Sequence, residues 1–211
     1  MPSNFRLPKI YPITDTKLSG LSHIEQIKAL LEGGANLAQI RDKTSSSREL
    51  FESVQECLAV CREHGALLVV NDRVDIVLAT GADGVHLGQN DLPPVEARKV
   101  LPPGTIIGFS THSVEQAIEA IKLPVDYIAA GPVFSTSSKK NPDPVVGLKG
   151  LEKIRDAIGD FPLVAIGGIT LENCREVLNA GADSVAMISA LVSQNTHITD
   201  KVRKAIEIAA K

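Results

Sequence analysis

The chain of 211 residues contains no tryptophan, and aromatic residues make up only 3% of it. Stacking platforms for nucleic-acid bases are therefore not expected. A basic block is also missing, since 25 acidic residues outnumber 22 basic ones and the net charge is −3. Both absences argue against nucleic acid as a partner.

Cysteine is scarce, with three residues, and their number is odd. Cys57 and Cys61 have the spacing of neighbours on one helix face, and no further pair follows at the spacing of a zinc site. We expect buried, reduced cysteines and a cytoplasmic protein. No stretch approaches the length of a membrane span, and the N-terminal residues lack the apolar core of a signal peptide, so no membrane partner is expected.

Short apolar runs alternate with longer amphipathic segments throughout the chain. Continuous apolar runs are typical of parallel strands that are covered on both faces. The eight runs are residues 10–14, 37–40, 67–70, 84–87, 105–109, 126–130, 163–167 and 184–188. Helices are expected between them, for example over residues 22–33, 47–63, 113–121 and 170–180. Thr170 is the expected N-cap of the last of these.

A weak internal repeat supports a closed arrangement of these strands. The segments GGANLAQI, TGADGVHL, PVDYIAA and AGADSVAM each lead into an even-numbered run. Repetition at every second unit is expected of a barrel, because alternate strands fill the same interior layers. We therefore predict one α/β domain over residues 1–211, a single (β/α)8 TIM barrel. A doubly wound open sheet is the alternative, but the glycine fingerprint that usually follows its first strand is missing.

Residues 131–148, GPVFSTSSKKNPDPVVGL, interrupt the alternation. The segment is too polar and too rich in proline for a helix or a strand. Loops of this length in a compact domain are usually functional lids or disordered insertions. Because it follows the sixth strand, we expect an active-site loop on the carboxyl-terminal face of the barrel.

Cationic and amide side chains follow the second strand in the segment QIRDK. Gln39, Arg41 and Lys43 alternate, so they lie on one side of an extended segment. Two cations directed into a barrel mouth are costly to desolvate unless an anion binds there. The segment therefore predicts an anion site, with a solvated rim of salt bridges as the alternative.

Two carboxylates, Asp72 and Asp91, follow the third and fourth strands. Neighbouring strand ends are close in a barrel, and two carboxylates with substrate oxygens and waters are the usual ligands of Mg²⁺ beside phosphates. Taken alone, the two residues would rather be N-caps of the helices that follow them. The metal interpretation depends on the polyanion that Arg41, Lys43 and Lys139 imply at the same mouth.

The remaining strand ends offer hydroxyl, imidazole and glycine groups. Ser110 has no adjacent triad pattern, so a nucleophilic serine is not expected. His112 is equally compatible with a general base and with a residue that only begins a helix. Gly167 and Gly168 would let backbone N–H groups approach a phosphate at a helix start, with Thr136 and Ser138 as additional hydroxyl donors.

These motifs together resemble the thiamine phosphate synthase family over residues 10 to 190. The resemblance rests on the order and spacing of YPITD, QIRDK, NDR, GVHLGQND, GFSTHS, DYIAAGPVFSTSSKK, VVGL, AIGGIT and VAMISAL. It implies a transferase that couples 4-amino-5-hydroxymethyl-2-methylpyrimidine diphosphate to hydroxyethylthiazole phosphate, which gives thiamine phosphate and diphosphate. The family is thought to ionise the pyrimidine first, so that no protein nucleophile is needed. Ser135 and Ser138 depart from the family's usual proline and threonine.

The resemblance also implies roles for individual residues. The pyrimidine diphosphate would be contacted by Gln39, Arg41, Lys43, Asn71, Ser110 and Lys139. The thiazole phosphate would be held by Thr136, Ser138, Gly168, Ile188 and Ser189. Asp72 and Asp91 would bind Mg²⁺ as cofactor, and catalysis would depend mainly on Lys139, Ser110 and Arg41.

Two other functions remain as alternatives. A thiazole tautomerase of the same superfamily would use His112 for proton transfer and would need no diphosphate site. A non-catalytic paralogue would bind thiazole phosphate only. The intact cation and carboxylate set favours the synthase over both. Phosphorylated small molecules are the expected partners, and a homo-oligomer is left open.

Overall fold

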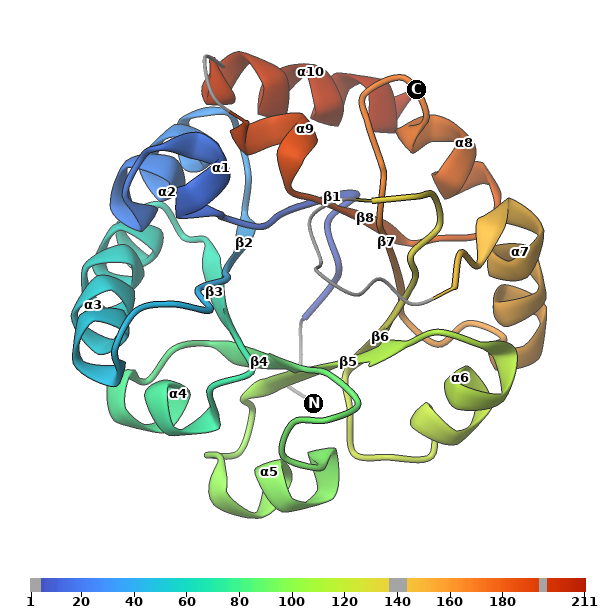
Figure 1. The fold of residues 1–211 in the computed structure, drawn as a ribbon, viewed down its shortest axis with the longest axis horizontal. Coiled ribbons are helices and arrows are strands. Elements are labelled where there is room, and N and C mark those ends of the chain that lie inside the picture. The colour runs from blue at the N-terminus through green and yellow to red at the C-terminus, as the bar shows by residue number, and fades with distance from the viewer. Residues whose placement is uncertain (1–4, 137–143, 194–196) are drawn as a thin grey trace.

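The structure, a computed structural model, describes residues 5–136, 144–193 and 197–211. Eight strands and the helices between them form a ring with the helices outside (Figure 1). The strands are β1 Ile10–Pro12, β2 Leu37–Ile40, β3 Leu67–Asn71, β4 Gly84–Leu87, β5 Ile106–Thr111, β6 Tyr127–Ala130, β7 Leu163–Ile166 and β8 Ser184–Met187. The helices are α1 Thr16–Ser19, α2 His23–Glu32, α3 Ser47–Glu63, α4 Val74–Thr80, α5 Pro94–Val100, α6 Val114–Ala120, α7 Gly147–Ile158, α8 Cys174–Asn179, α9 Ser189–Val192 and α10 Ile198–Ala210.

All eight strands are parallel and form one sheet in the order β1-β8-β7-β6-β5-β4-β3-β2. The sheet closes between β1 and β2 through a parallel bridge of Ile13 with Gln39 and a 2.9 Å hydrogen bond from Thr14 N to Gln39 O. The predicted (β/α)8 barrel is confirmed. Because all strands run the same way, their carboxyl ends gather at one mouth.

Apolar side chains pack in two places, inside the barrel and between the barrel and the helices. The interior cluster includes Leu37, Val69 and Ile106 together with the aromatic rings of Tyr11 and Tyr127. The two tyrosines are the largest fully buried side chains. Both tyrosines therefore lie in the centre of the barrel, whereas Phe51, Phe109, Phe134 and Phe161 pack between the barrel and the helices.

Local signals start several helices. Ser22 and Ser46 each form a capping box with the glutamate three residues later, at α2 and α3. The expected N-cap at Thr170 is wrong, because α8 begins only at Cys174 and Asn173 occupies the cap. The Oδ1 atom of Asn173 instead accepts a hydrogen bond from Thr170 N, which closes a turn in front of the helix. Within the described residues, no helix is both long and apolar enough to cross a membrane.

Candidate active site

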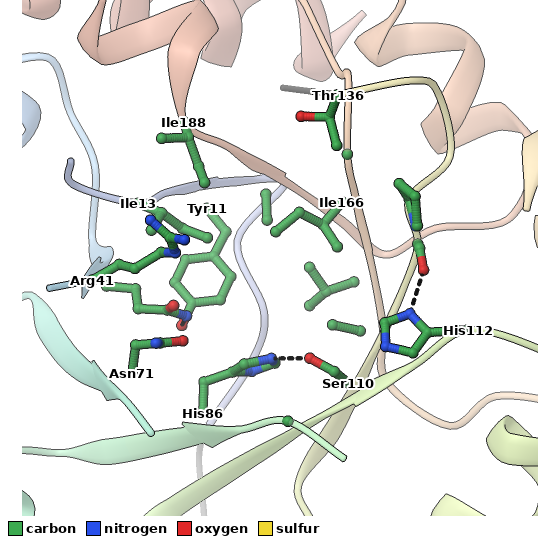
Figure 2. A pocket seen from close by; sticks show the side chains of 18 of the residues that line it. Tyr11, Ile13, Arg41, Asn71, His86, Ser110, His112, Thr136, Ile166 and Ile188 are labelled. Carbon is green, nitrogen blue, oxygen red and sulfur yellow. Dashed lines mark hydrogen bonds between the residues drawn. The ribbon is translucent and has the colours of Figure 1, made fainter. Parts of the chain in front are cut away.

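A cavity of about 450 Å³ opens at the carboxyl ends of the strands. Its walls come from every strand or from the segment directly after it, and Figure 2 shows side chains from β1, β3, β4, β5 and β7 converging on it. The cavity brings together almost all of the site residues expected from the sequence: Gln39, Arg41, Lys43, Asn71, Asp72, Asp91, Ser110, Thr136, Gly168, Ile188 and Ser189. Lys139 and Ser138 lie outside the described residues.

The two cations after β2 line the cavity and are each ion-paired. Arg41 Nη1 lies 3.1 Å from Asp15 Oδ2, and Lys43 Nζ contacts Asp72 Oδ2. Asp15 also caps α1 through the backbone N–H groups of Lys17 and Leu18. The salt-bridged rim that was the alternative interpretation is therefore present, and both cations still face the cavity.

Asp42, between the two cations, points away from the cavity as the alternation predicts. Its Oδ2 atom lies 3.2 Å from His23 Nε2, and its Oδ1 atom accepts from the N–H groups of Thr44 and Ser45. Burial alone would raise the pKa of Asp42, but these donors outweigh burial and leave the pKa well below its usual value. The ionised carboxylate fixes the turn that follows Lys43.

Asp72 and Asp91 meet at the edge of the cavity. Burial and the nearby Asp72 carboxylate both raise the pKa of Asp91, while the N–H of Gly88 and the charge of Lys43 lower it. Asp91 Oδ2 accepts from Gly88 N at 2.6 Å. Asp72 has φ 64°, a left-handed backbone that few residues other than glycine adopt. Neither residue caps a helix, because α4 is preceded by Arg73 and α5 by Pro93.

A buried donor beside these carboxylates has no protein partner. The Nδ2 atom of Asn71 is buried and makes no hydrogen bond among the described residues. A buried amide without a partner is unfavourable, so the position suits a ligand that supplies an acceptor.

Ser110 contacts a histidine that sequence reasoning did not include among the site residues. His86 Nε2 lies 2.9 Å from Ser110 Oγ, and His86 Nδ1 lies 3.0 Å from the hydroxyl of Tyr127. Burial lowers the pKa of His86 to about 4, although Asp91 opposes this. His86, Tyr11 and Ile166 also line the cavity. The polar His86 within the apolar run of β4 was a signal that could have found it.

His112 lies near Ser110, across the cavity from Arg41 (Figure 2). Its Nδ1 atom is 2.6 Å from the backbone oxygen of Gly131, which can only accept. The proton therefore resides on Nδ1. The backbone N–H of His112 donates to Gln116 Oε1 at 2.7 Å, so α6 and the segment after β6 both hold the residue.

The segment after β7 contains two glycines with positive φ, 102° at Gly167 and 64° at Gly168. A Cβ at Gly168 would lie 2.6 Å from Ser135 O and 2.7 Å from Phe134 Cβ. The glycines allow this close approach of two loops. The expectation that they begin a helix is wrong, because a turn separates them from α8. Ile188 precedes α9, whose first residue is Ser189.

A parallel barrel of eight strands with a charged cavity at the carboxyl ends has the architecture of a (β/α)8-barrel enzyme. A family model described as thiamine monophosphate synthase matches residues 10–191. A thiamine-phosphate synthase of Koribacter versatilis is 47% identical and covers 91% of this chain and 92% of its own length. One of Pyrococcus furiosus is 43% identical, with coverage of 94% and 95%.

Solved structures agree with these sequence matches. A thiamine phosphate pyrophosphorylase from Pyrococcus furiosus superposes with a TM-score of 0.85 at 41% identity and covers 96% of this chain and 97% of its own. The chain belongs to the thiamine monophosphate synthase family. The resemblance expected from the sequence is confirmed, and neither alternative function is favoured by these relatives.

Proposed function

We propose that this chain is a thiamine-phosphate synthase, a transferase that joins a pyrimidine diphosphate to a thiazole phosphate. The observation that carries the proposal is that two cations, two carboxylates and the glycines after β7 all line the same cavity. The product bond joins the pyrimidine methylene carbon to the thiazole nitrogen. The methylene–oxygen bond breaks, and its electron pair leaves with diphosphate.

The diphosphate is the group that needs cations. Arg41 and Lys43 enter the cavity from the segment after β2, and Lys139, which lies outside the described residues, is the third expected cation. Positive charge held close to the departing oxygens stabilises the charge that develops on them in the transition state. Gln39, Asn71 and Ser110 would hold the remainder of the same substrate, and the unpartnered Nδ2 of Asn71 fits an acceptor on it.

Asp72 and Asp91 would hold Mg²⁺. Burial and the neighbouring Asp72 carboxylate both raise the pKa of Asp91, and a divalent cation bound between the carboxylates would favour their ionised forms. Within the described residues no third acidic, histidine or cysteine ligand joins them. That set fits Mg²⁺, which keeps several waters and binds substrate phosphates. When bound, the ion would neutralise charge on the leaving diphosphate.

The thiazole phosphate would lie at the opposite wall. Thr136, Gly168, Ile188 and Ser189 line the cavity. The backbone N–H groups at Gly168 and the hydroxyls of Thr136 and Ser189 would donate to the phosphate, and Ile188 would be an apolar contact. Ser138, the other expected donor, lies outside the described residues. The loop expected at residues 131–148, whose last two residues belong to α7 and whose residues 137–143 lie outside those described, would cover both substrates and exclude water from the cationic intermediate. The cytoplasmic location stays a prediction from the sequence, which does not give the oligomeric state.

The decisive experiment combines both substrates with Mg²⁺ and measures thiamine phosphate. The wild-type chain should form it, and Asp72→Asn with Asp91→Asn should abolish Mg²⁺-dependent turnover while the protein stays folded. The matched control is Asp160→Asn with Asp200→Asn, which removes the same two charges from exposed positions. A wild-type chain that makes no product would refute the synthase function. If the Asp72→Asn, Asp91→Asn double variant remained active, only the metal site would be refuted.

A further inference from the structure

A continuous chain of hydrogen bonds crosses the interior of the barrel along the wall of the cavity. Gln39 Nε2 donates to the hydroxyl of Tyr11 at 2.9 Å, and this hydroxyl lies 3.1 Å from that of Tyr127. Tyr127 then contacts His86 Nδ1, and His86 Nε2 contacts Ser110 Oγ. The five side chains come from β2, β1, β6, β4 and β5, and we call them the interior relay.

The donors fix the direction of the interior relay. The Tyr11 oxygen accepts from Gln39, so the single proton of Tyr11 is available for Tyr127. Tyr127 then donates its own proton to His86 Nδ1. His86 therefore carries its proton on Nε2 and donates it to Ser110. The opposite direction requires Gln39 to turn its amide, so that Tyr11 would donate to the amide oxygen.

Packing keeps the interior relay in place. The ring of His86 stacks on that of Tyr127 with centroids 5.6 Å apart, and Tyr11 meets Tyr127 edge-on at 6.1 Å. Gly108 on β5 makes room, because a Cβ there would lie 2.1 Å from Tyr127 Cζ and 2.6 Å from His86 Nδ1. Burial raises the pKa of Tyr11 to about 12, and it also raises that of Tyr127 well above 10. Both phenols therefore keep the proton that the chain requires.

We infer that Tyr127 and His86 are positioning residues that direct the hydroxyl proton of Ser110 toward an acceptor of the pyrimidine diphosphate. Because Ser110 Oγ already accepts from His86, the serine presents its own O–H to the cavity it lines. This role rests on the proposed function for the identity of the acceptor. The tautomer of His86 does not depend on it.

Tyr127→Phe tests the relay, since it removes one hydroxyl and keeps the stacked ring. The Michaelis constant for the pyrimidine diphosphate should rise about tenfold, as for the loss of one oriented hydrogen bond, while that for the thiazole phosphate stays unchanged. His86→Gln should retain more activity than His86→Leu, because the glutamine amide can still donate to Ser110. The matched control is Thr111→Val, which deletes a buried hydroxyl bonded to Ala129 O beside Ser110, on the outer face of β5.

Nitrogen-15 NMR of the histidine rings provides a readout that does not depend on activity. His86, assigned by its absence from the His86→Gln spectrum, should carry its proton on Nε2, and Tyr127→Phe should move the proton toward Nδ1. A wild-type His86 protonated on Nδ1 would overturn the relay, as would an unchanged Michaelis constant in Tyr127→Phe. A wild-type chain that makes no thiamine phosphate would instead contradict the proposed function and leave the tautomer measurement intact.

Discussion

The two ends of the barrel are built differently. At the amino end, Asp83, Asp126 and Asp183 precede β4, β6 and β8, and each accepts a 2.8 Å hydrogen bond from a backbone N–H of the preceding odd-numbered strand. The backbone N–H of each aspartate in turn donates to the carbonyl oxygen of the strand residue whose N–H its side chain accepts. One structural solution therefore occurs three times. At the carboxyl end, the residues that line the cavity differ from strand to strand.

Arginines from the odd-numbered helices support the repeated aspartates. Arg98 of α5 lies 2.7 Å from Asp126, and Arg155 of α7 lies 2.6 Å from Asp183. At the third position, Arg62 of α3 donates to Gly81 O and acts on Asp83 only through its charge. The amino end thus joins neighbouring strands, whereas the carboxyl end holds two adjacent carboxylates and the Asn71 amide, whose Nδ2 atom has no hydrogen-bond partner among the described residues.

A cavity substitution should separate activity from stability most strongly. Lys43→Ala should lower kcat/KM by about 10²-fold if Lys43 stabilises the departing diphosphate. The side chain is 53% exposed, so the free energy of unfolding should change by less than about 0.5 kcal/mol. Steady-state kinetics and urea unfolding measure the two quantities, with Lys99→Ala as the exposed control. A large loss of stability with normal turnover would remove the contrast between the two ends.

The opposite outcome is expected at the amino end. Asp126→Ala should lower the free energy of unfolding by about 2–4 kcal/mol, because it leaves both the Ile107 N–H and Arg98 without their carboxylate. The kcat/KM of the folded fraction should stay within about twofold of the wild type. Chemical denaturation and active-site-normalised kinetics test this, and an inactive but stable variant would contradict it.

The three arginines should rank by their contacts. Arg98→Ala should destabilise more than Arg62→Ala, because Arg98 binds a carboxylate and two backbone carbonyls, whereas the exposed Arg62 binds one carbonyl. We expect a loss of about 1.5–3 kcal/mol at Arg98 and about 0.5 kcal/mol at Arg62. Thermal or urea unfolding of the two variants measures the ranking. Equal losses would show that the free energy of unfolding does not depend on these arginine contacts.

The smallest expected effect concerns pH at Asp83. Burial raises its pKa, while the Leu68 N–H and Arg62 lower it. Between the unfolded and the raised folded pKa, the folded state binds more protons, so the contribution of Asp83 to stability falls as pH rises. Asp83→Asn should therefore gain stability relative to the wild type from pH 4 to pH 7. Urea midpoints across this range measure it, and a constant difference would contradict the prediction.

Much of the architecture follows from local sequence. The eight apolar runs located all eight strands to within one or two residues, because side chains buried on both faces of a parallel sheet leave a continuous apolar signal. The start of α8 was harder to predict, since Thr170 and Asn173 are both residue types that commonly precede a helix. The segments that contain Asp83, Asp126 and Asp183 were visible as a repeat, but the sequence did not show that these aspartates join neighbouring strands.

The chain order by itself determined which polar residues follow each strand, and thereby the family and most residues of the cavity. Only the closed barrel decided which of them meet. Asp15 with Arg41, and Tyr11 with Tyr127 across 116 residues of sequence, are brought together by strand order and register. Sequence patterns report which face a side chain occupies, because burial follows a local period. Which side chain is the hydrogen-bond partner of another, and which of the two donates, depends on distances that are set when the sheet closes. The interior relay was therefore visible only in the folded chain.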